Sequence, residues 1–297
     1  MLISTLNRQG KQVLIIQLGS GLIGSAIARS ISDRAVLRDT HKVNWADISV
    51  TVSWLQALDL STDQLHSAEV IWAAGKAGFG ATPAETKVEI DNFTAITQAL
   101  SVVTRDLPTR FWLMSSAGGL HEGQTCVCDE NAINPSRPYA DLKLKQEQII
   151  KAQYQHHVLC RISSVYTTQN LSGRMGLIPV LMQNGIQHKV STLVGSESTL
   201  RDYVLDTDIG NYVVRHVLSK TDLQGIQYLV NGAPVSIRTI KGQIEQIILK
   251  KLYIKYASVM QNSANISFLK SLKSETFTST PMLSNIKILY NSILSYA

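Results

Sequence analysis

Short apolar runs alternate with longer amphipathic stretches along the first half of the chain. The apolar runs are typical of buried strands, and the stretches between them have helical periodicity. We therefore predict strands over 12–18, 35–37, 42–45, 69–74, 110–115 and 157–162, and helices over 25–31, 52–58, 85–101 and 139–153. This alternation predicts an α/β fold with a doubly wound parallel sheet and helices on both of its faces.

The alternation weakens after residue 162. Helices are predicted over 176–184, 208–218 and 237–250, with Ser236 as the N-cap of the last, and strands over 191–194 and 226–230. The stretch from 257 to 297 is polar and rich in serine and asparagine, and no element is predicted in it. We expect two interleaved domains, 1–162 with the sheet and 163–297 as a smaller mixed α/β lobe.

A glycine-rich turn follows the first predicted strand. Gly19, Gly21 and Gly24 form the pattern G-x-G-x-x-G between a strand and a helix, which is the context of a dinucleotide-binding loop. Gly19 allows the tight turn, Gly21 lets a pyrophosphate approach the backbone, and Gly24 permits close packing of the helix on the strand. The alternative is a tight strand–helix turn without a ligand.

The end of the second predicted strand bears on the choice of cofactor. An acid there binds the ribose hydroxyls of NAD, whereas an arginine accommodates the 2′-phosphate of NADP. Arg38 and Asp39 both stand at this position. The pair supports either cofactor, so NADP is not excluded beside the expected NAD.

Tyr139 and Lys143 stand four residues apart at the start of a predicted helix. This spacing places both side chains on one helix face, where the Lys ammonium favours the phenolate and makes a usable acid/base near neutral pH. The same spacing also occurs on solvated helix faces, so its meaning depends on its surroundings. Gly19, Ala74 and Ser116 all follow predicted strands, and ligands of parallel sheets bind at that edge.

Charge and composition exclude several classes of protein. The 297 residues are 44% apolar and 17% charged, which is typical of a globular protein. The net charge of +6 comes from residues 237–297, with 8 Lys+Arg against 2 Asp+Glu, but these basic residues are scattered and form no nucleic-acid motif. With no apolar run long enough to span a bilayer and no signal-peptide layout, we expect a cytoplasmic protein without membrane or nucleic-acid partners.

The cysteines give little indication of a metal site. Cys126, Cys128 and Cys160 are an odd number in a long chain, which does not suggest a disulfide framework. Cys126 and Cys128 have His121 nearby, but structural zinc sites usually have four ligands at wider spacing. No metal site is expected.

Several segments, in order, resemble one family, the extended short-chain dehydrogenase/reductases, which include the NAD-dependent nucleotide-sugar epimerases and dehydratases. QLGSGLIGSAIA (17–28) resembles the cofactor loop of the family, although Leu18 replaces its first glycine. IWAAG (71–75), SSAGG (115–119) and YADLK (139–143) are similar to its cofactor-lining strand end, its serine motif and its YxxxK motif. Two further segments, RISSVYT (161–167) and STLRDYVLDTDIGNYV (198–213), resemble later blocks of the family.

The resemblance implies a Rossmann-like fold in which 1–162 binds the dinucleotide and 163–297 binds the substrate. It implies that Tyr139 is the general acid and base, that Lys143 assists it and binds the nicotinamide ribose, and that Ser116 hydrogen-bonds the same substrate oxygen. Ser164 and Arg201 would bind the substrate, Arg201 through a diphosphate. The cofactor-binding residues that the resemblance implies are Gly19, Gly21, Leu22, Ile23, Asp39, Asp47, Ile48, Ala73, Ala74, Gly75, Asn92, Tyr139 and Lys143.

Structural alternatives exist for three of these residues. Ser116 could merely cap the next turn, Arg201 could pair with Asp202 or Asp208, and Asn92 could brace its own helix.

The residues after Ser116 narrow the reaction. Ala117 and Gly118 stand where the 4,6-dehydratases of the family carry Asp-Glu, and water elimination needs that additional acid and base. The expected reaction is therefore 4-epimerisation of a nucleotide-diphosphate sugar through a keto-sugar intermediate. The alternatives are an NAD(P)H-dependent keto-sugar reductase and a non-catalytic dinucleotide sensor. Dimerisation is common in the family, so a homodimer is a further expectation.

Overall fold

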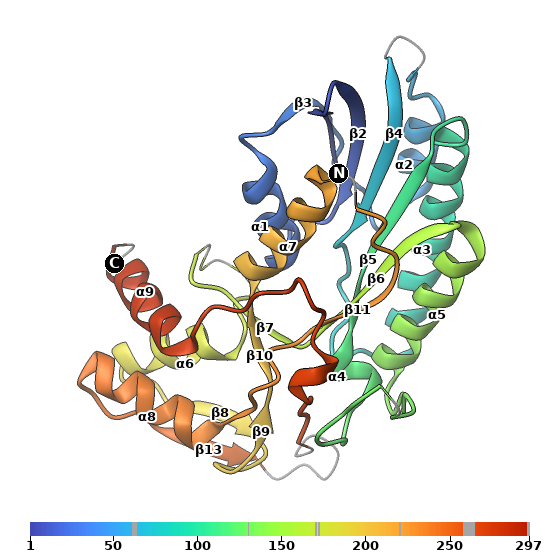
Figure 1. Cartoon of the computed structure of the whole chain (residues 1–297). Helices are drawn as coiled ribbons and strands as arrows, with labels where there is room; N and C mark the ends of the chain where they lie inside the picture. The colour runs from blue at the N-terminus through green and yellow to red at the C-terminus, as the bar shows by residue number, and fades with distance from the viewer. Residues whose placement is uncertain are drawn as a thin grey trace. The chain divides into compact units, whose positions relative to one another are not determined.

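The computed structural model describes residues 1–60, 64–129, 131–169, 171, 173–219, 221–257 and 265–295. A seven-stranded, mostly parallel sheet forms its central layer (Figure 1). In spatial order the strands are β11 (Gly225–Leu229), β6 (His156–Ile162), β5 (Thr109–Ser116), β4 (Leu65–Trp72), β2 (Lys11–Leu18), β1 (Leu2–Arg8) and β3 (Ala35–Thr40). The predicted fold class, a Rossmann-like doubly wound α/β sheet, is confirmed.

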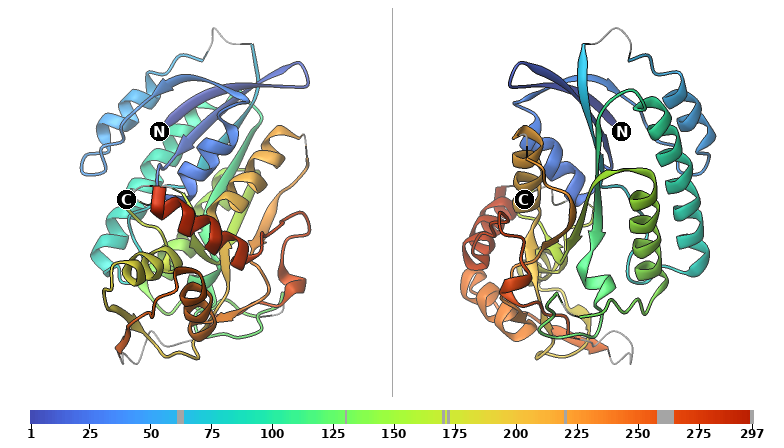
Figure 2. Two further views of the ribbon diagram at one scale, coloured as in Figure 1. Left: turned by 90° about the vertical axis from the view of Figure 1, so that its left-hand side faces the viewer. Right: turned by 45° about the vertical axis from the view of Figure 1, so that its right-hand side comes forward.

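Helices cover both faces of this sheet (Figures 1 and 2). One face carries α1 (Leu22–Ile31) and α7 (Asp206–Leu218), and the other carries α2 (Ser49–Gln56), α3 (Pro83–Val103) and α5 (Pro138–Gln153). A short helix, α4 (Ala117–Leu120), follows β5 directly. Because β2, β4 and β5 pair in parallel, their carboxyl ends meet at one edge, where β2 leads into the glycine turn.

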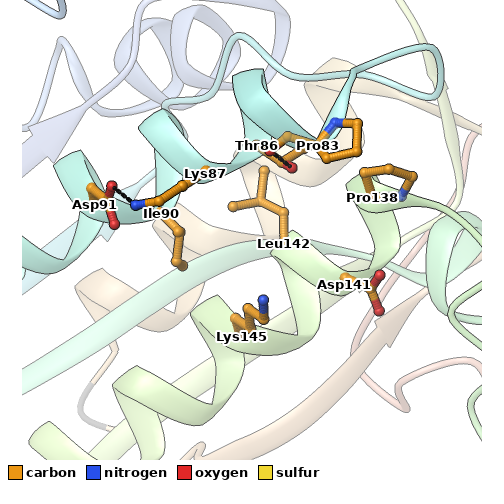
Figure 3. A pocket seen from close by; sticks show the side chains of 9 residues that line it. All are labelled: Pro83, Thr86, Lys87, Ile90, Asp91, Pro138, Asp141, Leu142 and Lys145. Atoms are coloured by element: carbon orange, nitrogen blue, oxygen red, sulfur yellow. Dashed lines mark hydrogen bonds and ion pairs between the residues drawn. The ribbon is translucent and has the colours of Figure 1, made fainter.

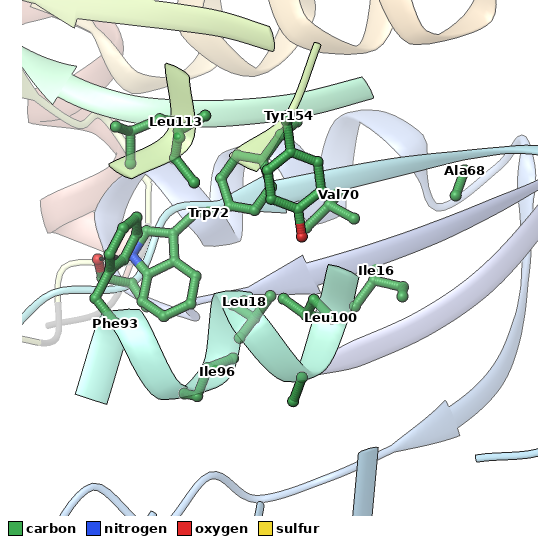
Figure 4. Close-up of a cluster of buried hydrophobic side chains, with 14 of the residues drawn as sticks. Ile16, Leu18, Ala68, Val70, Trp72, Phe93, Ile96, Leu100, Leu113 and Tyr154 are labelled. Carbon is green, nitrogen blue, oxygen red and sulfur yellow. Dashed lines mark hydrogen bonds between the residues drawn. The ribbon is translucent and has the colours of Figure 1, made fainter. Parts of the chain in front are cut away.

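The core beneath α3 explains why these apolar runs form strands (Figure 4). Every second residue of β2 and β4 on this face is fully buried against α3, and Trp72 and Phe93 meet edge to face with ring centroids 4.6 Å apart. Each such large side chain contributes about 1.5–3 kcal/mol through burial. The cluster includes Ile16, Leu18, Ala68, Val70, Trp72, Phe93, Ile96, Leu100, Leu113 and Tyr154.

An N-terminal hairpin adds a strand that the sequence analysis did not predict. β1 pairs antiparallel with β2 from Leu2 opposite Gln17 to Arg8 opposite Lys11, and its other edge pairs antiparallel with β3. The two-residue turn is formed by Gln9 and Gly10, both of which have positive φ. β1 therefore lies between β2 and β3, and β3, which contains the second predicted strand, does not pair with β2.

Two other predictions of secondary structure were wrong. Residues 42–45 form no strand, because their polar groups bond to side chains instead of a neighbouring strand: the carbonyl of Trp45 accepts from Asn92 Nδ2 at 3.0 Å. The polar stretch after 257 contains α9 (Met282–Ser295), which buries Ile286, Leu289 and Ile293 at helical spacing. Because of the residues that stand between these three positions, the helical periodicity was not recognised in the sequence.

The chain divides into two compact units, each described by itself. The first comprises Met1–Leu120, Pro135–Arg161 and Gly210–Gln227, and the second comprises His121–Asn134, Ile162–Ile209 and Tyr228–Ala297. The described residues of the second unit form small two-stranded sheets, a 3₁₀ turn and helices, and Ser236 caps one helix by accepting from Thr239 N at 3.1 Å. These elements are β7 (Ser164–Tyr166), α6 (Leu177–Ile186), β8 (Ser191–Val194), β9 (Leu200–Arg201), β10 (Tyr203–Leu205), β12 (Val235–Ser236), α8 (Ile237–Ile248), β13 (Ile254–Ala257), η1 (Lys270–Leu272) and α9.

No helix among the described residues has the length and apolar character needed to cross a bilayer.

Candidate active site

The three glycines of the turn after β2 have different surroundings. Gly19 has φ +105°, and a Cβ there would overlap the backbone of Ala73. A Cβ on Gly24 would overlap the carbonyl oxygen of Gly19, so the first turn of α1 packs directly on the loop. A Cβ on Gly21 would meet nothing within 4 Å. Two of the glycines are therefore needed for packing, whereas Gly21 leaves the N-terminus of α1 open to a ligand.

A buried glutamine that was not singled out in the sequence supports this loop. Gln17 is 3% exposed, and its Nε2 donates to the carbonyl oxygens of Gly24 at 2.8 Å and Gly19 at 3.2 Å. Ser25 Oγ donates to Ser20 O at 2.8 Å on the outer side. The signal in the sequence was a polar residue inside an apolar strand immediately before the turn. These bonds leave the amide groups at the start of α1 in a fixed cradle, the geometry that binds a pyrophosphate.

We expect Gly21→Ala and Gly19→Ala to separate ligand binding from folding. Gly21 has φ −74°, which alanine adopts freely, so Gly21→Ala should keep the melting temperature while NADH affinity falls at least about tenfold, because the methyl group occupies the cradle. Gly19→Ala should unfold several degrees lower, because its methyl group meets backbone at positive φ. Differential scanning fluorimetry and NADH fluorescence titration measure the two effects. Equal NADH affinity in Gly21→Ala and the wild type would contradict the role of the cradle.

Ser116 and Tyr139 come together around Gly119. Ser116 ends β5, Gly119 lies in α4, and Tyr139 lies in the first turn of α5. A Cβ on Gly119 would lie 3.1 Å from Tyr139 Cε1 and 3.3 Å from Ser116 Oγ, so both side chains border the same point. Ser116 Oγ accepts a hydrogen bond from Gly119 N at 3.0 Å, which leaves its own proton to donate. The sequence analysis did not single out Gly119, which the close approach of these side chains requires.

Lys143 lies one turn after Tyr139 and is buried. Its Nζ donates to Met114 O at 3.2 Å and to Gln146 Oε1 at 3.1 Å, and it lies 5.9 Å from the centroid of the Tyr139 ring. The ammonium is thus anchored to β5 on the same side of α5 as the phenol. A phenol can exchange a proton with a substrate oxygen, and the ammonium beside it is a hydrogen-bond donor.

A buried ion pair lies directly behind Ser116. Glu147 is 1% exposed and accepts from Ser115 Oγ at 2.6 Å, and from Arg161 Nε at 3.1 Å and Nη2 at 2.8 Å. The hydroxyl of Ser115, the serine beside Ser116, is thus engaged by Glu147. The network therefore ties the end of β5 to α5 and β6, which fixes Ser116 relative to Tyr139.

The segment after β4 lies over Tyr139. Ala73, Ala74 and Gly75 form the strand end, and Glu89 Oε2 accepts from the amides of Lys76 at 2.8 Å and Ala77 at 2.7 Å. The Phe79 ring lies 5.4 Å from the Tyr139 ring, centroid to centroid. Phe79 belongs to no recognised sequence motif. Its position shortly after the end of a strand was the only sequence feature that indicated a place near the site.

The remaining expected cofactor residues of the first unit make hydrogen bonds within their own segments or to a neighbouring one. Asp47 Oδ1 accepts from Ser49 N at 3.1 Å at the start of α2, with Ile48 beside it. Asn92 braces the segment after β3 through its bond to Trp45 O, so its side chain is engaged there. Asp39 is exposed on β3, and its Oδ1 accepts from Thr40 N at 2.6 Å.

The two expected substrate residues belong to the second unit. Ser164 begins β7, which pairs in parallel with β10, and its amide donates to Asp202 O at 3.2 Å. Arg201 lies on β9, where it pairs with Val235 of β12. The carboxylate of Asp202 accepts from the amides of Asn231 at 2.8 Å and Gly232 at 2.7 Å. Burial raises the pKa of Asp202, and these amide bonds counteract that rise.

A groove of about 480 Å³ between α3 and α5 does not contain the reactive groups (Figure 3). Lys145 and Asp141 border it, and Lys87 pairs with Asp91 at 2.8 Å along its rim. Tyr139 and Lys143 are not among its lining residues. Nor is there, among the described residues, a group of three His, Cys, Asp or Glu side chains placed to hold a metal ion.

Comparison with known proteins assigns this chain to a family. A family model described as "NAD dependent epimerase/dehydratase family" matches residues 18–230. The chain belongs to this family. The match begins at the last residue of β2, so β1 lies outside it, and it includes the glycine turn, Ser116, Tyr139 and Lys143. No curated protein matches the chain.

Solved structures of two epimerases and of a further enzyme share the fold over nearly their whole length. The UDP-glucose 4-epimerase of Thermus thermophilus, in complex with NAD, superposes with a TM-score of 0.74 at 16% identity, covering 96% of this chain and 99% of that one. The UDP-N-acetylglucosamine 4-epimerase of Methanobrevibacter ruminantium gives a TM-score of 0.76 at 15% identity, with 96% and 98% covered. WbmH of Bordetella bronchiseptica, in complex with NAD⁺, gives 0.70 at 18% identity, with 96% and 98% covered.

Proposed function

We propose that this chain is an NAD(P)-dependent epimerase of nucleotide-diphosphate sugars that acts through a 4-keto intermediate. The observation that carries the proposal is the approach of Ser116 and Tyr139 around Gly119, with Lys143 anchored behind them, in the unit that also holds the glycine turn. The first unit would bind the dinucleotide, and the second would bind the sugar nucleotide.

In this proposal Tyr139 moves the proton. As phenolate it accepts the proton of the sugar hydroxyl, and as phenol it returns a proton when the carbonyl is reduced. Ser116 donates to the same oxygen, because the lone pair on its other side already accepts from Gly119 N. Lys143 supplies fixed positive charge that favours the phenolate and donates to the ribose of the bound dinucleotide. When bound, the dinucleotide supplies the acceptor and donor of the hydride.

The open cradle at Gly21 fits such a dinucleotide. Gly21 is the N-cap of the ten-residue helix α1, a Cβ there would meet nothing within 4 Å, and the first amides of a helix have no partner within it. Leu22 and Ile23 form the first turn and would contribute these amides. The strand end Ala73–Gly75 and the Lys143 ammonium would line the remainder of the cofactor.

Epimerisation is favoured over dehydration by the residues that follow Ser116. Ala117 and Gly118 are buried in α4 and offer no acid or base, so Tyr139 is the one proton-transfer group proposed. Oxidation and re-reduction at one carbon need a single such group, whereas water elimination needs two more. For the substrate, Arg201 is proposed to bind the diphosphate, because a guanidinium matches phosphate oxygens with paired donors.

Activity on sugar nucleotides tests this proposal. Purified protein is incubated with UDP-, GDP- and dTDP-hexoses without added cofactor and with NAD or NADP, and the products are identified by NMR. We expect interconversion of two 4-epimers that needs no stoichiometric reductant. Strict consumption of NAD(P)H with a keto sugar would favour a reductase instead. Dinucleotide binding without turnover of any sugar nucleotide would favour the sensor.

A further inference from the structure

The inserted strand β1 changes which residues can reach the ribose of a bound dinucleotide. In a doubly wound sheet, the acid that bonds the ribose 2′-hydroxyl lies at the end of the strand next to the glycine turn, about 20 residues after it. Asp39 has this sequence spacing from Gly19, and Arg38 stands beside it. Both lie on β3, however, and β1 separates β3 from β2.

The register gives the size of this displacement. Asp39 is opposite Ile3 on β1, and Ile3 is opposite Ile16 on β2, so Asp39 is level with a residue three positions before Gly19. With strands about 4.8 Å apart and a rise of about 3.3 Å per residue, Asp39 lies roughly 10 Å to the side of β2 and roughly 10 Å short of the turn. An aspartate side chain is too short to close that distance to the turn.

β1, the strand that does adjoin the turn, has no carboxylate or guanidinium there to take the place of Asp39 or Arg38. β1 meets β2 at its end with Leu2 opposite Gln17, and the side chains of Met1 and Leu2 carry neither a carboxylate nor a guanidinium. β1 is held along its whole length, because all seven of its residues pair with β2, and Arg8 Nη1 at its far end donates to the buried Glu69 at 2.8 Å. The position of β1 between β2 and β3 is therefore fixed by strand pairing.

We propose that neither Asp39 nor Arg38 contacts the 2′ position of the adenosine ribose. The site therefore binds NADH, with its 2′-hydroxyl, and NADPH, with its 2′-phosphate, with similar affinity. This inference rests on the proposed function, since it concerns the same dinucleotide. A carboxylate beside the turn weakens binding of a 2′-phosphate by charge repulsion and strengthens binding of a 2′-hydroxyl through a hydrogen bond. Displacing that carboxylate by one strand removes both effects.

Fluorescence titration of the full chain with NADH and with NADPH tests the inference without any turnover. The wild type and Asp39→Ala are compared, and Gly21→Ala serves as the control in which the cradle itself is filled. Asp39 is exposed on an edge strand, so Asp39→Ala is expected to fold, and Asp39→Asn provides a second variant of the same shape.

We expect the dissociation constants of the wild type for NADH and NADPH to agree within about threefold, and Asp39→Ala and Asp39→Asn to change neither by more than that. Loss of a charge-assisted bond to the ribose would instead weaken NADH binding about tenfold or more. Such a loss, or at least a tenfold preference of the wild type for either nucleotide, overturns this inference and leaves the proposed function standing. Failure of the wild type to bind either nucleotide contradicts the proposed function and this inference together.

Discussion

Replacing Tyr139 by phenylalanine should lower the turnover of the sugar nucleotide by about 10²–10⁴-fold, because the variant keeps the ring and loses the one proposed proton-transfer group. The ring contact with Phe79, at 5.4 Å between centroids, does not involve the hydroxyl and should survive. NADH affinity should fall only slightly, since the glycine turn is untouched. Steady-state kinetics and NADH titration on the same preparation separate the two quantities.

Tyr253→Phe is the matched control for this variant. Tyr253 is 54% exposed in the second unit, so loss of its hydroxyl should leave turnover and affinity near the wild-type values. If Tyr139→Phe retained more than about a tenth of the wild-type turnover, general acid/base catalysis by this phenol would be ruled out.

Replacing Glu69 by alanine should lower the free energy of unfolding by about 3–5 kcal/mol, the usual effect of removing one partner from a buried ionic network. Glu69 is 2% exposed on β4 and accepts from Arg8 Nη1, from Arg110 Nε and Nη2, and from Trp112 Nε1, all between 2.8 and 2.9 Å. Its loss leaves two guanidinium groups without their anion at the base of the sheet. Urea denaturation followed by circular dichroism measures the change.

The exposed pair of Lys87 and Asp91 provides the control for Glu69. These side chains are 74% and 60% exposed at i,i+4 spacing on α3, so Lys87→Ala should cost at most about 0.5 kcal/mol. Glu69→Gln keeps the size and part of the hydrogen bonding, so its loss of unfolding free energy should lie between the losses for Lys87→Ala and Glu69→Ala. A loss below about 1 kcal/mol for Glu69→Ala would show that the network contributes little to stability.

The sequence predicted the elements of the sheet well where the signal was local. The run QVLIIQL before the glycines, the apolar run ending at Ser116 and the helix of Tyr139 all form as expected. The order of the strands was less accessible, because pairing is decided by contacts between segments and not within them. The strand Leu2–Arg8 alternates only weakly between apolar and polar residues, so neither its existence nor its place between β2 and β3 was predicted.

The proposed reactive residues stand in recognisable sequence motifs, but the residues that support them do not. Ser116, Tyr139 and Lys143 stand in motifs whose spacing follows from strand ends and helix turns. Gln17 bonds to the carbonyl groups of the turn that follows it, and Glu147 bonds to Ser115 and Arg161 on two strands, so neither belongs to a recognised motif. Their clearest sign was a polar residue at a position that the apolar periodicity assigns to the interior.

The fate of a labelled hydrogen tests the central proposal most directly. Sugar nucleotide carrying deuterium at C4 is incubated with the protein, without added reductant, and the product is analysed by NMR. Oxidation by a retained dinucleotide and return of the hydride to the same carbon predict the 4-epimer with deuterium still at C4, and no such product with Tyr139→Phe. Loss of the label to solvent, or incorporation of solvent hydrogen at a neighbouring carbon, would contradict the account.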